Sequence, residues 1–262
     1  MNQLPTQSWT AKWHLKTIII VLILCGLLIK SAQICEINGS ALSQNFSQFF
    51  DLLKKMSHPQ WSYGEIVLQP IIETIKMAII GTTLGAICAL PLCIFAARNI
   101  ITNRFITSSI RFILNIIRTI PDLMLAAVFV AIVGIGPLAG IFTLAVFSFG
   151  MIAKLFYEAI ETIDNGPLEA LEAAGANKVQ IIVFAVLPQV MNNFISYFLY
   201  TLEINVRAST VLGYLGAGGI GVYLQRSLDS YNYQQTAIII LAILVVVLII
   251  DGLSNYLREK LL

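Results

Sequence analysis

The sequence has few charged residues. Lys, Arg, Asp and Glu make up 11% of the 262 residues, whereas roughly a quarter of the residues in a soluble domain are charged. Hydrophobic residues make up 58% of the chain, so a water-soluble globule of this size would lack the polar side chains needed to cover its surface. The composition therefore excludes a soluble protein and predicts a chain surrounded by lipid.

The sequence also has few residues that could carry chemistry. The two histidines lie outside the long apolar segments, and no nucleophile–base pairing or metal-ligand spacing is present. No GxxxxGK followed by Ser or Thr occurs, so the chain cannot bind ATP through a phosphate loop. The net charge of +2 is too small to indicate nucleic-acid binding. We expect no catalytic residue, metal or cofactor in this chain, and no structural disulfide. Four thiols are predicted to be buried apolar side chains: Cys25, Cys35, Cys88 and Cys93.

Long apolar segments dominate the rest of the chain. A bilayer core takes about 20 helical residues, and six segments of this kind occur at 17–35, 74–97, 118–135, 138–158, 190–212 and 236–257. The alternation of period two that a membrane barrel needs is missing, and helices satisfy the backbone. The sequence predicts an all-α polytopic membrane protein with about six transmembrane helices. The first segment could instead be the core of a signal peptide.

Basic residues predict the orientation, because Lys and Arg resist translocation more than Asp and Glu do. They fall before the first segment, between the second and third, and after the sixth: Lys12, Lys16, Arg98, Arg104, Arg111, Arg118, Arg258 and Lys260. Both termini are therefore expected in the cytoplasm and residues 36–70 outside, although Lys54 and Lys55 count against this. The outer segment contains FSQFFDLLKKM, which predicts either a helix in the membrane interface or a short external helix packed on the spans.

Small residues and a proline predict where helices meet and turn. Gly81 and Gly85 stand one turn apart in the second span, which would let another helix approach closely. Pro137 is positioned to begin the fourth span after a short connection from the third. Pro121 predicts a local bend near the start of the third span.

The loop at about 159–188 is a polar stretch between two spans. Asp164 and Asn165 can accept hydrogen bonds at a helix start, Pro167 suits the first turn, and Glu169 lies at the positive helix end. Gly175 can end that helix. The pattern predicts a short helix, a turn and a second helix that returns to Leu187-Pro188 at the mouth of the fifth span.

This loop resembles the EAA loop of ABC importer permeases. Glu169, Ala170, Gly175, Leu187 and Pro188 fit the spacing of that motif, while Leu171 and Ala185 depart from it conservatively. Other segments resemble the phosphonate ABC importer permeases in particular: RTIPDLMLA at 118–126, KLFYEAIETIDNGPLEAL at 154–171, VLPQV at 186–190, EINVRASTVLG at 203–213 and GAGGIG at 216–221. Methionine and choline importer permeases share similar Gly-rich segments.

The resemblance implies a type I-like importer subunit of the bacterial inner or plasma membrane. Residues 71–262 would form the permease core, and residues 1–70 an N-terminal span with an external segment. Implied partners are a second copy of the chain, two ATPase subunits that bind ATP and Mg²⁺, and an external substrate-binding protein. The ATPase-coupling residues implied are Glu169, Ala170, Glu172, Gly175, Leu187 and Pro188. An ion-coupled secondary transporter is the alternative, but it would ordinarily show more spans and an internal repeat.

Three groups of residues are candidates for the transport pathway or its gate. Glu203 and Arg207 stand four apart in the fifth span and are predicted to form an ion pair, either structural or in the pathway. Arg118 and Asp122 are also four apart, although Arg118 could simply reach the cytoplasmic interface. The third group consists of Gly216, Gly218, Gly219 and Gly221. These glycines are predicted to break the fifth helix and to act either as a hinge or as a cradle for anionic oxygens.

Overall fold

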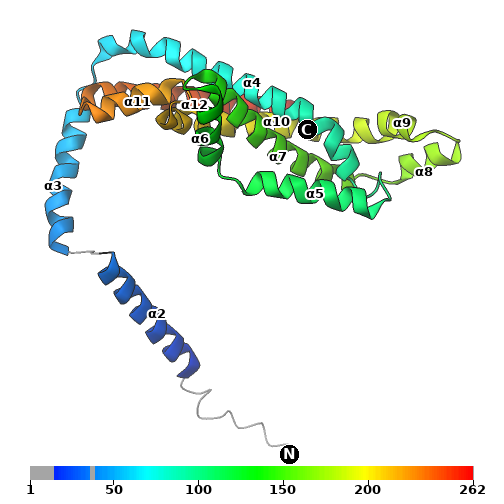
Figure 1. The fold of residues 1–262 in the computed structure, drawn as a ribbon, viewed down its shortest axis with the longest axis horizontal. Helices are drawn as coiled ribbons and strands as arrows, with labels where there is room; N and C mark the ends of the chain where they lie inside the picture. Colours follow the sequence, from blue (N-terminus) through cyan, green and yellow to red (C-terminus); the bar gives the residue numbers. More distant parts are fainter. Residues whose placement is uncertain (1–14, 36–38, 262) are drawn as a thin grey trace, which may run out of the picture. The chain divides into compact units, whose positions relative to one another are not determined.

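The computed structural model describes residues 15–35 and 39–261, and all of the regular elements in these ranges are helices (Figure 1). The all-α prediction is confirmed for this part of the chain. The structure falls into two compact units, the first ending at Lys55 and the second beginning at Met56.

The first unit contains α2 (Leu15–Ile34) and most of α3 (Gly39–Met56). α2 is apolar along its length, with mean hydropathy 2.3 over its candidate span. In α3 the rings of Phe46, Phe49 and Phe50 are exposed and touch one another, with centroids 5.3 Å apart for Phe46 and Phe50. The predicted helix is present, and its placement in the membrane interface stays a prediction.

The second unit is a bundle of long helices joined by short ones. Its elements are η1 (Trp61–Tyr63), α4 (Gly64–Ala96), α5 (Arg104–Thr119), α6 (Asp122–Val133), α7 (Pro137–Glu161), α8 (Gly166–Ala173), α9 (Lys178–Ile181), the π-helical η2 (Ile182–Val186), α10 (Leu187–Leu212), η3 (Gly213–Leu215), α11 (Ile220–Asp229) and α12 (Tyr233–Leu261). In Figure 1, α8 and α9 lie at one end of this bundle, and α11 lies at the other. Pro137 begins α7, as predicted.

Five segments of the described chain are long and apolar enough to cross a membrane: Lys16–Ile34, Trp61–Ala96, Pro137–Glu161, Lys178–Leu215 and Tyr233–Lys260. The span predicted at 118–135 is present only as a bent pair, α5 with α6, which would make a sixth candidate, and the bend predicted at Pro121 is confirmed. α5 and α6 meet there at 86°, because Pro121 has no N–H to donate and holds Ile120 extended at ψ 122°. α6 has 12 residues and is about 18 Å long, too short to cross a core of about 30 Å alone.

The prediction that all four cysteines are buried is also wrong. Cys93 is buried, whereas Cys25, Cys35 and Cys88 are exposed, and all four thiols are free. A thiol behaves as a small apolar group, so the outward face of a lipid-embedded helix suits it as well as the interior does. The hydrophobicity of these residues therefore could not distinguish a core position from a lipid-facing one.

α4, α7 and α10 pack directly against one another at the centre of the bundle. A Cβ atom at Gly85 would lie 2.5 Å from the carbonyl oxygen of Ala145, and one at Gly81 would lie 2.7 Å from Cβ of Leu144. The predicted close approach of another helix to these glycines is confirmed, and that helix is α7.

A buried polar contact joins the same three helices. Nδ2 of Asn205 in α10 donates to Oγ1 of Thr82 in α4, at 2.7 Å, and to Oγ of Ser148 in α7, at 2.6 Å. All three side chains are buried. Directional hydrogen bonds fix the rotation of one helix against its neighbours in a way that apolar contacts do not.

We expect Asn205→Ala to lower the free energy of unfolding by about 1–3 kcal/mol, because two interhelical hydrogen bonds are lost and a cavity is left. Asn193→Ala, on a half-buried position of the same helix, is the control and should cost less than about 0.5 kcal/mol. Thermal unfolding of the purified protein in detergent measures both. Equal midpoints for the two variants would contradict the structural role of Asn205.

Candidate functional site

α8 protrudes from the end of the bundle and carries no buried residue. Glu169, Ala170, Glu172 and Ala173 are all exposed. Figure 1 places α8 and α9 beyond the last turns of the long helices. The predicted sequence of short helix, turn and second helix is therefore present, with its outer surface open to a partner.

The first arm of the corner begins at Asp164. The carboxylate of Asp164 accepts a hydrogen bond from the backbone N–H of Gly166 at 3.0 Å, and Pro167 lies in the first turn. Asn165 occupies the cap position, but its side chain caps nothing. The predicted capping role is confirmed for Asp164 and wrong for Asn165, because its helical backbone conformation, with φ −79° and ψ −18°, differs from the extended one usual for a cap.

Gly175 ends the first arm, as predicted. Its φ is +82°, a left-handed conformation that costs other L-residues roughly 1–2 kcal/mol. Its N–H donates to the carbonyl of Glu172 and the N–H of Ala176 donates to the carbonyl of Leu171, both at 3.0 Å. This pair of bonds closes a Schellman turn, so the reversal of the chain is set by backbone geometry.

The second arm begins with a capping box. The side chain of Asn177 accepts from the N–H of Gln180 at 2.9 Å, and the side chain of Gln180 accepts from the N–H of Asn177 at 2.8 Å. The helix then runs into α10 through the π-helical turn of η2. Pro188 follows this turn, and the wider ring of backbone atoms leaves room for a residue that has no N–H.

The second helix returns to Leu187-Pro188 at the start of α10, as predicted, and the π turn lets the helix continue through the proline within the longer segment Lys178–Leu215. The position of Leu187-Pro188 at the mouth of the fifth span stays a prediction.

Gln189 connects the two arms, and sequence reasoning missed it. Its Oε1 accepts from the N–H of Asp164 at 3.1 Å, and its Nε2 donates to the carbonyl of Asp164 at 3.3 Å. The start of the first arm is thereby attached to the start of α10. The available signal was the position of Gln189 directly after Leu187-Pro188, in the segment that carried the resemblance.

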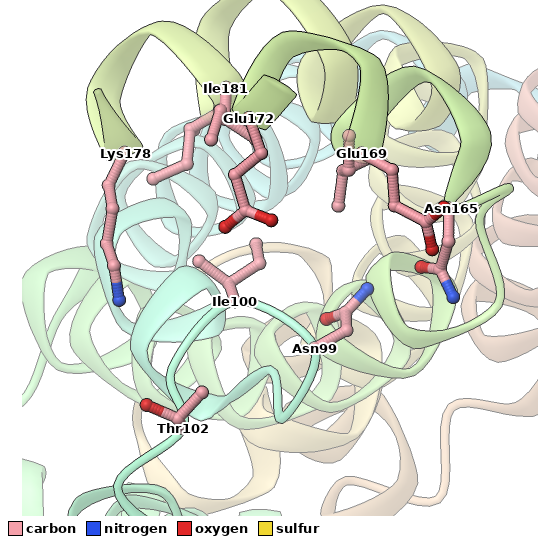
Figure 2. Close-up of a pocket in the computed structure, with 10 residues that line it drawn as sticks. Asn99, Ile100, Thr102, Asn165, Glu169, Glu172, Lys178 and Ile181 are labelled. Atoms are coloured by element: carbon pink, nitrogen blue, oxygen red, sulfur yellow. The ribbon is translucent and has the colours of Figure 1, made fainter. Parts of the chain in front are cut away.

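A pocket of about 320 Å³ lies between α8, α9 and the turn that follows α4. Figure 2 shows the carboxylate of Glu172 pointing into this space, that of Glu169 beside Asn165, and Asn99 and Ile100 on the opposite wall. Neither carboxylate forms an ion pair with another described residue. The pocket thus presents two carboxylates without an ion-pair partner among the described residues, together with the side chain of Lys178, at the exposed end of the bundle.

A network around Glu161 holds the base of this corner. The carboxylate of Glu161 forms an ion pair with Arg111 of α5 and accepts from the N–H of Arg98 at 2.8 Å. Arg111 also donates to the carbonyl of Ala96 at 2.9 Å and lies over the ring of Tyr157. The C-terminal ends of α4 and α7 are joined in this way to the middle of α5. Sequence reasoning used Arg111 only for orientation, because its partner is distant in the chain.

The predicted Glu203–Arg207 ion pair is present. Glu203 is buried, and its second oxygen is 3.2 Å from Nη2 of Arg258 in α12. Arg258 was predicted only to mark the cytoplasmic end of the sixth span. The cluster of Glu203, Arg207 and Arg258 therefore joins α10 to α12.

Arg118 and Asp122 do not share a helix face, although they stand four apart in the sequence. The break at Pro121 separates them, so Arg118 ends α5 and Asp122 begins α6. The side-chain stem of Arg118 packs beside Gly150, and the carboxylate of Asp122 accepts from the N–H of Leu123 at 2.9 Å. Within residues 15–35 and 39–261 the two form no ion pair with each other.

The glycine-rich segment breaks the helix after α10, as predicted. Gly216, Gly218 and Gly219 have φ of +80°, +82° and +73°. Two of the amides that a cradle would need are used within the protein, because Ile220 N–H donates to Thr74 Oγ1 at 2.8 Å and Gly219 N–H to Glu73 Oε1 at 3.3 Å.

The same segment is held on its other sides as well. Gly216 accepts from Gly136 N–H at 2.8 Å, and Gly221 lies too close to the carbonyl of Thr210 to carry a side chain. The geometry disfavours the anion cradle, because amides that it would need are already bonded within the protein, and the hinge interpretation stays a prediction.

Comparison with known proteins identifies the family. Residues 67–262 match the model of the binding-protein-dependent transport system inner membrane component. The chain is 42% identical over 201 residues to the phosphite transport system permease protein PtxC of Stutzerimonas stutzeri, covering 77% of this chain and 73% of PtxC. It is 37% identical over 234 residues to the phosphate-import permease protein PhnE of Mycolicibacterium smegmatis, covering 89% of this chain and 44% of PhnE.

The fold is similar to that of a solved transporter. A chain of the MetNI methionine ABC transporter, in an inward-facing conformation, superposes with a TM-score of 0.68 at 26% identity, covering 75% of this chain and 96% of that one. The helical bundle and the exposed α8 corner are consistent with the family model that matches residues 67–262. This chain belongs to the family of binding-protein-dependent transport system inner membrane components.

Proposed function

We propose that this chain is the membrane permease subunit of an ABC importer for phosphonates or related phosphorus oxyanions. The observation that carries the substrate class is the identity of 42% to a phosphite permease and 37% to a phosphate permease. A methionine-type permease is the second candidate, because the similar solved fold belongs to a methionine transporter at 26% identity. The higher identity to the phosphorus permeases favours the first.

Coupling to a separate ATPase is assigned to the α8 corner, with Glu169, Ala170, Glu172 and Gly175 at the contact. The exposed alanines let a partner approach closely, and the free carboxylates of the pocket can pair with basic side chains. Leu187 and Pro188 position the returning arm. Because Gln189 ties Asp164 to α10, a displacement of α8 would be passed to that helix.

The working assembly is proposed to contain two copies of this chain, two ATPase subunits that bind ATP and Mg²⁺, and an external substrate-binding protein. We place it in the bacterial inner or plasma membrane, with both termini on the cytoplasmic side. In this arrangement α8 faces the ATPases, and the end of the bundle with α11 faces the binding protein. Hydrolysis by the partners would then bias the bundle between outward-open and inward-open states.

The test is reconstitution of the chain in vesicles with its ATPase and binding protein. We expect uptake of radiolabelled phosphite or methylphosphonate to require ATP and both partners, and methionine and choline to be excluded. Vesicles that hold this chain alone should accumulate nothing. Accumulation by the chain alone without nucleotide would contradict the proposal. ATP-dependent uptake of methionine in place of phosphite would favour the second candidate, the methionine-type permease.

A further inference from the structure

The exposed faces of α10 and α12 differ in chemistry. The outward side of α12 is aliphatic, with Ile240, Leu241, Leu244, Val245, Leu248 and Ile249 exposed. The outward side of α10 and η3 instead presents Tyr200, Arg207, Val211 and Tyr214 at spacings of seven, four and three residues, which places them on one helical face. Lipid suits the first face. An arginine within a candidate span faces protein or a water-filled space rather than hydrocarbon, and we assign the second face to the transport pathway.

The two arginines beside Glu203 are held very differently. Arg258 donates to three acceptors, namely Glu203 at 3.2 Å, Asn255 Oδ1 at 2.7 Å and the carbonyl of Ser254 at 3.4 Å. Arg207 donates from its side chain to Glu203 alone among the described residues, and 52% of its side chain is exposed. A guanidinium carries five N–H donors. Most of those on Arg207 therefore remain free to bind a ligand.

The charges of the cluster do not balance. Two guanidinium groups share the one carboxylate of Glu203, and Arg207 and Arg258 have no other ion-pair partner in the described chain. One positive charge is left over, and it resides mainly on the more exposed Arg207. An anion that reached this face could bind Arg207. Glu203, the present partner of Arg207, would still be paired with Arg258.

We propose that Arg207 is the residue that binds the phosphorus oxyanion during its passage. The substrate then replaces Glu203 as the partner of Arg207, and Glu203 stays paired with Arg258. The inference rests on the proposed function and specifies its substrate contact. A planar guanidinium donates two parallel N–H bonds to two oxygens of a tetrahedral oxyanion, whereas lysine acts as a point charge. The leftover positive charge would also disfavour a cationic solute such as choline.

The experiment measures ATP-dependent phosphite uptake by the reconstituted complex with four variants. Arg207→Gln is expected to reduce kcat/KM for uptake at least tenfold, and Arg207→Lys about threefold to tenfold, because the charge stays and the paired bonds are lost. Lys260→Gln, which removes a positive charge at the end of α12, should stay within twofold of the parent. ATP hydrolysis in the absence of substrate should be the same in all of them.

The double variant Glu203→Gln with Arg207→Gln separates binding from structure. If Arg207 served only to neutralise Glu203, removing both charges would restore uptake. We expect uptake to stay at least tenfold down. Restored uptake, or an Arg207→Gln variant that transports within twofold of the parent, would overturn this inference while leaving the proposed function intact. A parent complex that takes up no phosphorus oxyanion would overturn both.

Discussion

Replacing Gly175 with proline is expected to abolish coupled transport while the protein still inserts in the membrane. Gly175 has φ +82°, and proline is locked near −65°, so the turn between α8 and α9 cannot form. The N–H that bonds the carbonyl of Glu172 is lost as well. We expect ATP-dependent uptake to fall at least tenfold, with ATP hydrolysis no longer stimulated by substrate and binding protein.

Gly175→Asn is the matched control, because asparagine tolerates the left-handed conformation better than other residues with a Cβ. No other atom lies within 4 Å of a Cβ added at this position, so the side chain itself would not clash. Most of the coupled uptake should therefore survive in that variant. Normal uptake by the proline variant would contradict the assignment of the α8 corner as the coupling element.

Replacing Gly85 with leucine is expected to prevent the bundle from forming. A Cβ at this position would lie 2.5 Å from the carbonyl oxygen of Ala145 and 2.7 Å from the backbone nitrogen of Phe149. These are backbone atoms of α7, which cannot move aside without separating two helices that pack along most of their length. Overpacking typically costs about 1–3 kcal/mol, and a clash with backbone belongs at or above the upper end of this range.

The measurement is the yield of monodisperse protein after membrane extraction. Gly252→Leu in α12 is the control, because no atom lies within 4 Å of a Cβ added there. We expect the Gly85 variant to aggregate or be degraded and the Gly252 variant to behave as the parent does. A monodisperse Gly85→Leu protein with an unchanged unfolding midpoint would show that α4 and α7 do not pack as the structure has them.

Local signals in the sequence predicted much of the α8 corner. A residue with a carboxylate before a proline, an acid in the first turn and a glycine at the end are sufficient to indicate a short helix and its reversal. Asp164 and Gly175 act as those signals predict. Asn165 does not, since a capping residue is defined by backbone conformation as well as by its type.

Contacts between distant residues could not be predicted from the chain. Gln189 binds Asp164 across 25 positions, and Arg111 pairs with Glu161 across 50. Spacing of this size leaves no periodic signal, because the partners meet only after the helices between them have packed. For the same reason Arg258 was not expected beside Glu203, from which it is 55 residues distant.

By itself the sequence determined the class of the protein. Its hydrophobicity requires lipid, and lipid requires the backbone to bond within helices. Gly81 and Gly85, one turn apart, indicated where another helix could approach closely. The tertiary structure decided which residues face which surroundings. Apolar side chains are equally suited to a helix interface and to hydrocarbon, so composition cannot separate the lipid-facing side of α12 from its packed side. A charged side chain does distinguish the two surroundings, because a guanidinium avoids hydrocarbon. The free donors of Arg207 became apparent only once α10 and α12 were placed together.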